Sequence, residues 1–401
     1  MAIIAVRPMK KEKKHKKQDG RPKIPEASQR LLWGCSAGRC EFQGCNKPLW
    51  KAPTTKQQVN IAEVAHIIAF SAFGPRGKKT VSSRLAKDLS NLMLLCGACH
   101  TLIDDREDDY HVELLREMKR KHERRVELAT SIHEDKSSHI LLYGANIGQQ
   151  SSLVSYEKAA AAMLPDSYPA DTHAITFGML NSSFSDCSDS FWRIETANLR
   201  QKTAQLLRPR LATGEIKRLS IFALAPQPLL ILLGSLIPDV TSAEVFQKHR
   251  EPDTWAWQPG TADFSYTVLE PSKADGTPAL VFSLSASVTD DRICAVLGDN
   301  TSIWKVTIAE PNNDFLKTKQ QAQAFRQQMR RLLDRMKERH GEKAVIHVFP
   351  AMPVALAVEF GRIIMPKADL PLAIYDQNRV LGGFVKALDV NTPSVGGGDA
   401  G

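Results

Sequence analysis

The pattern of apolar and polar positions divides the chain into two regions with different periodicities. In the first region, short apolar runs at residues 61–68 and 92–95 are separated by a polar loop with glycine and proline over residues 71–89. A short helix is expected over residues 27–33. Apolar residues at helical spacing over residues 110–129 indicate an amphipathic helix with a basic face. The order of elements after the first helix is therefore strand, loop, strand and helix.

From about residue 160 to residue 390, apolar strands alternate with helices. The expected strands are residues 174–177, 219–224, 266–269, 279–284, 306–308 and 345–349. The clearest helix is expected over residues 314–339, where apolar side chains follow one stripe. This alternation predicts an α/β fold.

Two segments of this second region resemble one another. Residues 220–234 and 346–361 each contain an apolar strand, a turn with two prolines, an apolar helix and a glycine. We interpret the pair as two related α/β halves that face each other. The alternative is chance similarity between two ordinary strand–turn–helix units.

Composition changes mark the expected domain boundaries. A lysine-rich tail over residues 1–25 is poor in apolar residues and is expected to be disordered. One domain is expected over residues 26–132 and a second over 159–390, joined by a polar linker over 133–158. A glycine-rich tail over 391–401 should be flexible.

Charge and hydropathy limit the classes of function. The 401-residue chain carries a formal net charge of +9, concentrated in the N-terminal tail and in residues 116–125. The second cluster makes Lys119, Arg120 and Arg124 candidates for binding DNA phosphates. The alternatives are a disordered tail and a solvated helix face. No apolar run reaches the length of a membrane span and no signal-peptide pattern is present, so a cytoplasmic protein is expected.

Four of the seven cysteines form two close pairs, Cys40-x4-Cys45 and Cys96-x2-Cys99. Because Zn(II) prefers four soft ligands in a tetrahedron, these pairs predict a structural zinc site that closes the segment between them. Two unrelated thiol pairs are the alternative. The other cysteines are expected to be packed thiols.

Three residues near these cysteines predict phosphodiester chemistry. His66 lies inside the first apolar run, Asn91 precedes the second, and His100 follows Cys99. A histidine can activate water while a divalent metal bound by a second histidine neutralises charge on the phosphate. Asn91 is expected either to pin the loop or to orient the His66 ring. A buried core histidine is the alternative interpretation of His66.

Residues 30–130 resemble the HNH endonucleases and their ββα-metal fold. The motifs that carry the resemblance are Ser36-Ala-Gly-Arg-Cys40, Ala62-Glu-Val-Ala-His-Ile-Ile68, Asn91-Leu-Met-Leu-Leu-Cys96 and Cys99-His-Thr-Leu-Ile-Asp104. The resemblance implies that His66 is the general base, Asn91 an orienting residue and His100 a ligand of Mg(II) or a similar metal. Many family members carry an acidic or histidine ligand where this chain has Ala65. Glu63, Asp104 or waters are then the candidates to complete the metal shell.

Residues 160–390 resemble the SAVED domain, a cyclic-oligonucleotide sensor built from two fused CARF-like halves. The carrying motifs are His347-Val-Phe-Pro-Ala-Met-Pro353, Ala355-Leu-Ala-Val-Glu-Phe-Gly361, Leu372-Ala-Ile-Tyr-Asp376 and the segment from Gln247 to Trp257. Lys248, Arg250 and His347 are candidates to lie near ligand phosphates. The candidates for stacking on bases are Trp255, Trp257, Phe349 and Tyr375, for each of which core packing is the alternative.

Together the two regions are similar to the HNH–SAVED effectors of bacterial anti-phage signalling (CBASS). This similarity implies a double-stranded DNA endonuclease that is activated by a cyclic di- or trinucleotide from a partner nucleotidyltransferase. Ligand-induced assembly into a dimer to tetramer would switch it on. A modification-dependent restriction nuclease is one alternative. A non-catalytic, zinc-stabilised DNA-binding module is the other, because Ala65 leaves the metal shell in doubt.

Overall fold

The computed structural model describes residues 22–147, 154–178, 184, 186–260, 264–272 and 275–392. Most of the expected N-terminal tail and almost all of the expected C-terminal tail lie outside these residues. Contacts divide the chain into two compact units, Met1–Ser131 and Ile132–Gly401. Among the described residues, no helix combines the length and apolar character needed to cross a membrane.

The first unit is built around a two-stranded antiparallel sheet. Strands β1 (Ala62–His66) and β2 (Leu92–Cys96) pair so that Ala62 lies opposite Cys96 and His66 opposite Leu92. Every residue of β2 is buried. The order of elements agrees with the order expected from the sequence.

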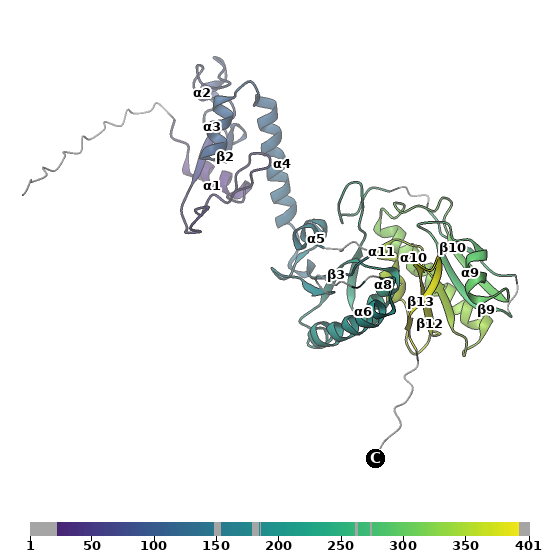
Figure 1. The fold of residues 1–401 in the computed structure, drawn as a ribbon. Coiled ribbons are helices and arrows are strands. Elements are labelled where there is room, and N and C mark those ends of the chain that lie inside the picture. The colour runs from purple at the N-terminus through teal and green to yellow at the C-terminus, as the bar shows by residue number, and fades with distance from the viewer. Residues whose placement is uncertain are drawn as a thin grey trace, which may run out of the picture. The chain divides into compact units, whose positions relative to one another are not determined.

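Helices cover this small sheet and contribute to its core (Figure 1). The helical elements of this unit are α1 (Glu26–Cys35), α2 (Ser82–Leu85), the 3-10 turn η1 (Leu89–Asn91), α3 (Gly97–Asp105) and α4 (Val112–Thr130). Leu32 of α1 and Leu115 of α4 are fully buried in the core. The core contains few large side chains, which makes a covalent or metal staple valuable.

The second unit contains two sheets. The first is parallel, with β4, β3, β6 and β7 in that order and β5 paired to β3. Its strands are β3 (Ser137–Gly144), β4 (Tyr168–Pro169), β5 (Ile175–Phe177), β6 (Arg218–Leu224) and β7 (Ser242–Phe246). Its helices are α5 (Tyr156–Met163), α6 (Asp189–Lys202), α7 (Arg208–Ala212) and α8 (Gln227–Leu236), with the π-helical turn η3 (Thr203–Leu207) before α7 and the 3-10 turn η2 (Glu134–Lys136) before β3.

The linker expected over residues 133–158 is wrong for most of its length. Strand β3 lies inside this range and pairs with β6 from His139 to Gly144. Only the short run Ile140–Tyr143 marks it in the sequence, because a strand buried on both faces lacks apolar–polar alternation. The polar residues around that run favoured a loop.

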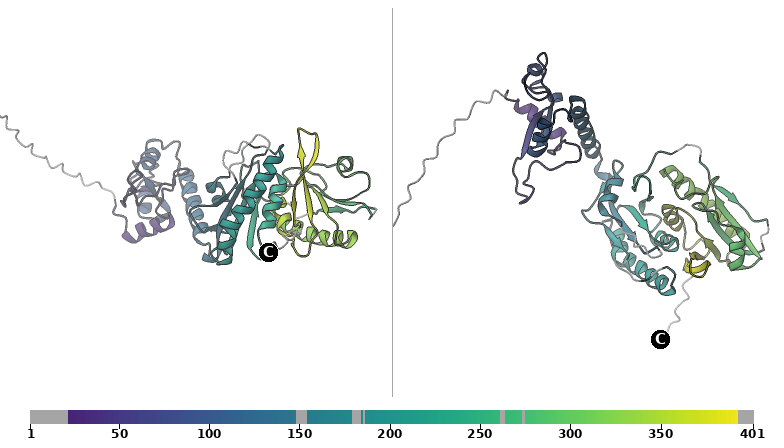
Figure 2. Two further views of the ribbon diagram at one scale, coloured as in Figure 1. Left: turned by 60° about the horizontal axis from the view of Figure 1, so that its bottom comes forward. Right: turned by 45° about the horizontal axis from the view of Figure 1, so that its top comes forward.

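The second sheet has six strands in the order β13, β12, β11, β9, β10 and β8. The four central strands are parallel, and β13 and β8 add antiparallel edges. The strands are β8 (Thr267–Leu269), β9 (Thr277–Ser283), β10 (Thr301–Thr307), β11 (Ile346–Phe349), β12 (Leu372–Asn378) and β13 (Gly383–Val390). The helices are α9 (Asp290–Leu297), α10 (Lys319–His340) and α11 (Val354–Arg362). Colour separates the two halves, teal for the first and green to yellow for the second (Figure 2).

Helices α8 and α11 pack against each other where the two halves meet. Each follows the strand of one of the two similar sequence segments, β6 for α8 and β11 for α11. A Cβ atom added at Gly234 of α8 would lie 2.1 Å from the carbonyl oxygen of Val358. A Cβ at Gly361 of α11 would lie 2.0 Å from the carbonyl oxygen of Ile231. The repeated glycine therefore permits direct backbone contact between the helices, as the interpretation of two facing halves requires.

We predict that Gly361→Ala lowers the free energy of unfolding of the second unit by about 3 kcal/mol, because the helices must separate to admit the methyl group. Urea unfolding followed by tryptophan fluorescence measures the change. Gly383→Ala is the matched control, since a Cβ at Gly383 meets no atom within 4 Å. Equal stability of the two variants would contradict the proposed backbone contact.

Candidate functional site

The structure brings the four paired cysteines together. One sulfur atom from each of Cys40, Cys45, Cys96 and Cys99 lies within 4.8 Å of the others, and the Cys45 and Cys96 sulfurs are 3.9 Å apart. A tetrahedron of sulfurs about 2.3 Å from Zn(II) has edges of about 3.8 Å. The cluster thus has the donor type and the spacing that a zinc ion needs. It is the one group of at least three potential ligands that meets these distances within the described residues.

Electrostatics in the cluster favour a bound cation. Burial raises the pKa of Cys40 to about 12 and also raises the pKa of Cys99. Four adjacent thiolates would repel one another without a metal, whereas Zn(II) binds the deprotonated form. The remaining cysteines lie outside the cluster, and Cys35 is exposed rather than packed.

His66, the last residue of β1, lies at a cavity of about 260 Å³. Its Nε2 is 2.9 Å from the carbonyl oxygen of Ala86, and its ring packs at an angle against Phe70. His100 and Asp104 of α3 line the same cavity. The two histidines that the sequence singled out therefore face one space, although 33 positions separate them in the chain.

Asn91 pins the loop between the strands. Its amide oxygen accepts a hydrogen bond from the backbone nitrogen of Ile68 at 2.9 Å, and its amide nitrogen donates to the Ile68 oxygen at 2.9 Å. The same nitrogen donates to the carbonyl oxygen of Leu85 at 3.2 Å. Because Leu85 precedes Ala86, Asn91 also helps to fix the carbonyl that contacts His66. The same hydrogen bonds of Asn91 thus hold the loop in place and support the backbone that contacts the His66 ring.

The two acidic candidates contact opposite sides of the His100 ring. Glu63 lies 2.5 Å from Nδ1, whereas Asp104 lies 3.4 Å from Nε2. One metal ion cannot bind a single ring nitrogen together with both carboxylates in this arrangement. Glu63 therefore fits the role of a partner that orients the imidazole, as is common beside metal-bound histidines. Nε2 of His100 and the carboxylate of Asp104 are the two groups of this cavity that could bind one metal ion together.

Arg76 is a residue of this site that the sequence did not single out. It lies in the loop after β1, and its buried guanidinium donates to the carbonyl oxygen of Ile67 at 2.8 Å and to that of Ile103 at 2.5 Å. A third bond, 3.0 Å long, reaches Oδ1 of Asp104. Arg76 thus connects the end of β1 to the helix that carries the metal donors. Arg76 lies between two glycines in Phe73-Gly-Pro-Arg-Gly77, and a charged residue in such a tight turn could have indicated a structural role from the sequence.

The expected DNA-binding residues of α4 are mostly paired with acids. Lys119 is buried, 2.6 Å from Glu123, and the side chain of Arg120 forms an ion pair with Glu117. Arg124 is exposed on the same helix. Helical spacing of three and four residues creates these pairs, whereas Arg116, Arg124 and Arg125 form no ion pair within the described residues. Lys119 is therefore unsuited to contact DNA.

A second cavity, of about 390 Å³, lies at the carboxyl ends of strands from both sheets of the second unit. It is lined by residues at the ends of β6, β9 and β12 and by the turns that start α8 and α11, an arrangement typical of ligand sites in α/β sheets. Gln227 and Gln247 bond across it, accepting from the backbone nitrogens of Met352 at 3.1 Å and Ala355 at 3.2 Å. These bonds join the first half to the start of α11.

Two of the expected ligand-binding residues line this cavity. Lys248 and Arg250 do so, and the Lys248 ammonium pairs with Asp253. Asp376 and Arg379 also line the cavity, and neither was predicted from the sequence as a ligand-binding residue. Burial raises the pKa of Asp376 to about 7, with a further upward contribution from nearby Asp186. Asp376 directly follows the four buried residues at the start of β12, and a carboxylate at that position of the sequence could have indicated a cavity residue.

The other five candidates do not line this cavity. Trp255 and Phe349 are buried in side-chain cores, packed against Phe222 and Tyr375 respectively. Nδ1 of His347 lies 2.9 Å from the hydroxyl oxygen of Tyr375. Nε1 of Trp257 donates a hydrogen bond to Oε1 of Glu244 at 3.0 Å. Trp255, Phe349 and Tyr375 are buried, as the core-packing alternative expects, whereas Trp257 and His347 are only partly buried.

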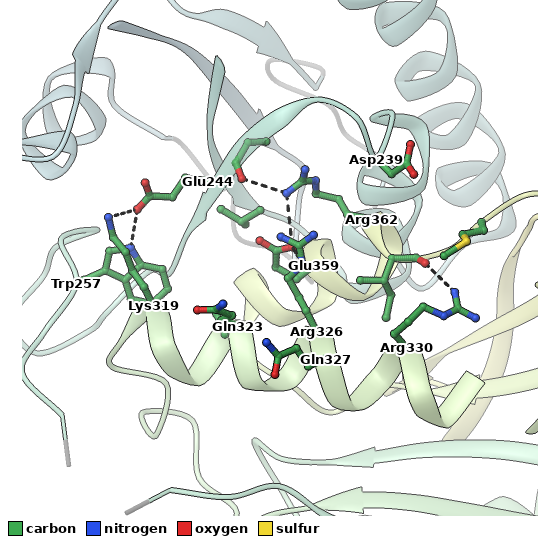
Figure 3. Close-up of a pocket in the computed structure, with 15 residues that line it drawn as sticks. Asp239, Glu244, Trp257, Lys319, Gln323, Arg326, Gln327, Arg330, Glu359 and Arg362 are labelled. Carbon is green, nitrogen blue, oxygen red and sulfur yellow. Dashed lines mark hydrogen bonds and ion pairs between the residues drawn. The ribbon is translucent and has the colours of Figure 1, made fainter. Parts of the chain in front are cut away.

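A larger cavity, of about 790 Å³, lies between β7, α10 and the end of α11 (Figure 3). Its cations are paired with acids: Lys319 with Glu244, Arg326 and Arg362 with Glu359, and Arg330 with Asp369. Burial raises the pKa of Glu359 and lowers the pKa of Arg362. An anionic ligand would have to displace these pairs, so we assign the cluster a structural role.

Comparison with known proteins identifies the second unit. Residues 199–390 match the family model of the SMODS-associated and fused to various effectors sensor domain, SAVED. The matched SAVED region includes the whole second sheet, strands β6 and β7 of the first sheet and most of the residues that line the 390 Å³ cavity. A search of curated proteins finds no match to the chain.

Solved structures with similar chains are SAVED/CARF-domain receptors. Cap4 of Acinetobacter baumannii with the cyclic trinucleotide 2'3'3'-cAAA has 11% identity and a TM-score of 0.41, covering 78% of this chain and 65% of that chain. Its structure with 3'3'3'-cAAA has 12% identity and a TM-score of 0.40, covering 78% and 67%. Cap4 of Moraxella osloensis has 11% identity and a TM-score of 0.35, covering 71% and 59%. The chain thus spans slightly less than two thirds of the first of these receptors.

We predict that Cys96→Ser removes most of the bound zinc and exposes the first unit to limited proteolysis, because the small core depends on the four-thiolate site. Atomic absorption on the purified full-length protein measures the metal. Cys35→Ser is the control, since Cys35 lies outside the cluster, and it should retain about one zinc per chain. Full zinc content in the Cys96 variant would show that these sulfurs are not the ligands.

Proposed function

We propose that this protein is a cyclic-oligonucleotide-activated, metal-dependent endonuclease of double-stranded DNA and an effector of anti-phage defence. One observation carries the proposal: His66, His100 and Asp104 line a single cavity in a chain that also contains a SAVED sensor domain. A reactive group and a metal-binding pair in one cavity are the minimum that phosphodiester hydrolysis requires.

His66 is the proposed general base. Its Nε2 donates to the Ala86 carbonyl, which assigns the acceptor lone pair to Nδ1. Nδ1 is therefore the atom that would take a proton from the attacking water. Asn91 keeps that carbonyl in place through its bonds to the loop. The histidine can then change its protonation state without changing its orientation.

His100 and Asp104 are the proposed donors for a divalent metal of the Mg(II) class, which would neutralise charge on the scissile phosphate. Glu63 holds Nδ1 of His100, so that Nε2 faces Asp104. Arg76 holds the other oxygen of Asp104. A structural Zn(II) bound by the cysteines would keep α3 fixed against the end of β2. Ala65 contributes no ligand, and water would complete the metal shell.

The 390 Å³ cavity is the proposed site of the activating cyclic di- or trinucleotide, a product of a partner nucleotidyltransferase. Lys248, Arg250 and Arg379 supply positive charge there. The first turns of α8 and α11 begin at this cavity, and helix N-termini favour phosphates. The match to a sensor domain family supports this assignment.

Activation would proceed through assembly into a dimer to tetramer that brings nuclease units together on DNA. The ligand can drive assembly only if it binds the assembled state more tightly than the free chain. Helix α11 provides a physical connection, since it starts at the ligand cavity and packs along α8 from the other half.

We predict that wild-type protein with Mg(II) cleaves supercoiled plasmid only when one member of a panel of cyclic di- and trinucleotides is present. His66→Ala should lower the cleavage rate at least 100-fold, because the general base is lost. Gel analysis of nicked and linear products measures the rate. His133→Ala, which changes an exposed histidine, should cleave at the wild-type rate.

Several outcomes would contradict the proposed function. Cleavage of modified DNA alone, without any nucleotide, would favour a modification-dependent restriction nuclease. Unchanged cleavage by the His66 variant would remove the histidine from the reaction. No cleavage with any member of the panel, together with retained DNA binding, would favour a non-catalytic DNA-binding module.

We predict that the activating nucleotide binds 5- to 10-fold more tightly at pH 6 than at pH 8. Three cations (Lys248, Arg250 and Arg379) and three carboxyl groups (Asp186, Asp314 and Asp376) line the cavity. With a pKa of about 7, Asp376 is mostly neutral at pH 6 and mostly ionised at pH 8, so the cavity repels phosphates more at the higher pH. Isothermal titration calorimetry at both pH values measures the difference.

Asp376→Asn should bind the nucleotide equally at the two pH values, with an affinity close to that of the wild type at pH 6. Asp291→Asn, at an exposed position of α9, should keep the wild-type pH dependence. A wild-type affinity that does not change with pH would show that Asp376 does not face the ligand.

A further inference from the structure

A hairpin-like loop over residues 46–60 projects from the first unit just before β1, and we refer to it as the Trp50 loop. Its two arms are joined by backbone hydrogen bonds from Val59 to Trp50 at 3.0 Å and from Ala52 to Gln57 at 2.8 Å. Its base is fixed by a bond from Leu49 to Gly38 at 2.9 Å. The loop is therefore a formed structural element.

Trp50 is exposed although its neighbour Leu49 is fully buried. The tryptophan retains 40% of its surface and Val59 on the opposite arm retains 44%. The Arg39 guanidinium lies 5.4 Å from the centre of the indole ring, and the Lys51 ammonium lies 5.8 Å from it. Trp50 and Val59 thus expose apolar surface beside two cations that lie near the indole ring.

The loop carries positive charge without compensating acids. Residues 46–60 contain Lys47, Lys51 and Lys56 and no aspartate or glutamate. Lys56 donates to the carbonyl oxygen of Pro53, and within the described residues no ion pair involves these lysines or Arg39. On α4, by contrast, Arg120 and Lys121 both pair with Glu117. Part of the positive charge on α4 is thus paired with acids of the same helix, whereas the charge of the loop is not paired with an acid within the described residues.

We infer that the Trp50 loop binds the phosphate backbone of duplex DNA, with the lysines and Arg39 on phosphates and the Trp50 indole against sugar and base edges in the minor groove. Phosphate contacts from lysine and arginine supply most of the affinity of such interfaces, and apolar side chains commonly enter the minor groove. This inference rests on the proposed DNA endonuclease function, for which it names the substrate-binding surface.

Strand β1 separates the loop from the proposed general base. The loop leads into β1 at Ala62, and four residue steps separate Ala62 from His66 at the other end of the strand. At about 3.3 Å per residue this strand is ~13 Å long. The loop is therefore a binding element separate from the catalytic residues.

The test measures duplex binding by full-length protein in a His66→Ala background without added Mg(II), so that DNA stays intact. Fluorescence anisotropy of a labelled 30-base-pair duplex is recorded over a series of salt concentrations. Replacing Lys47, Lys51 and Lys56 with glutamine should reduce the slope of log affinity against log salt by about 2 to 3, because each lost phosphate contact lowers it by about 0.9. Trp50→Ala should weaken binding about 10-fold with little change in slope.

The matched control replaces Arg120 and Lys121 of α4 with glutamine, and should leave the slope within about 0.5 of the parent value. Thermal unfolding of each variant verifies that the first unit stays folded. Unchanged affinity and slope in both loop variants would overturn the inference, as would a loss confined to the α4 variant. Trp50-dependent binding that prefers single strands to duplex would overturn the assignment to duplex DNA.

The result also separates this inference from the proposed function. The same loop substitutions are also made in protein that keeps His66, and cleavage is measured with Mg(II) and the activating nucleotide. A wild-type cleavage rate together with unchanged duplex affinity would refute the loop as the DNA surface and leave the proposed nuclease intact. Loop-dependent duplex binding without cleavage under any ligand would refute the nuclease and leave the binding surface intact.

Discussion

The backbone contact between α8 and α11 determines how the second unit is built. Gly234 and Gly361 bring the two helices so close that neither position has room for a methyl group. Both helices begin at the ligand cavity, and Gln227 and Gln247 tie the first half to the start of α11. The walls of the cavity therefore belong to two halves that cannot slide past each other freely. A ligand that bonds to both halves acts on a rigid pair of helices.

The first unit depends on a different constraint, the meeting of four cysteines from two distant parts of the chain. Cys40 and Cys45 come from the turn after α1, whereas Cys96 and Cys99 join β2 to α3. The cluster fixes the start of α3, where His100 directly follows Cys99 and Asp104 lies about one turn further along, and both line a cavity with His66 of β1. Arg76 and Asn91 then close the long loop onto the same place. The four cysteines and the residues that line the His66 cavity are therefore separate sets of side chains within one small unit.

Much of this organisation could be predicted from the sequence, because close cysteine pairs, helical spacing and strand-length apolar runs are local signals. The cysteine cluster, the shared cavity of His66 and His100 and strands β8, β9 and β11 follow from such signals, whereas β12, β13 and most of β10 were not predicted. The errors concern properties that depend on distant partners. Strand β3 lacked alternation because both of its faces are buried, and Trp255 and Phe349 fill cores that only the folded chain creates. Lys119 is neutralised by Glu123, and Glu63 contacts the ring nitrogen of His100 that faces away from Asp104.

Arg362 has a consequence for how copies of this chain can associate. Strand β7 is the last strand of the parallel sheet, and an open strand edge can recruit a strand from another molecule. The Arg362 guanidinium donates to the carbonyl oxygens of Thr241 at 3.0 Å and Ala243 at 3.2 Å, at the start of that edge. It occupies acceptors that an added strand would need. Pairing of another strand with the start of β7 is thereby disfavoured by a side chain from helix α11 of the same chain.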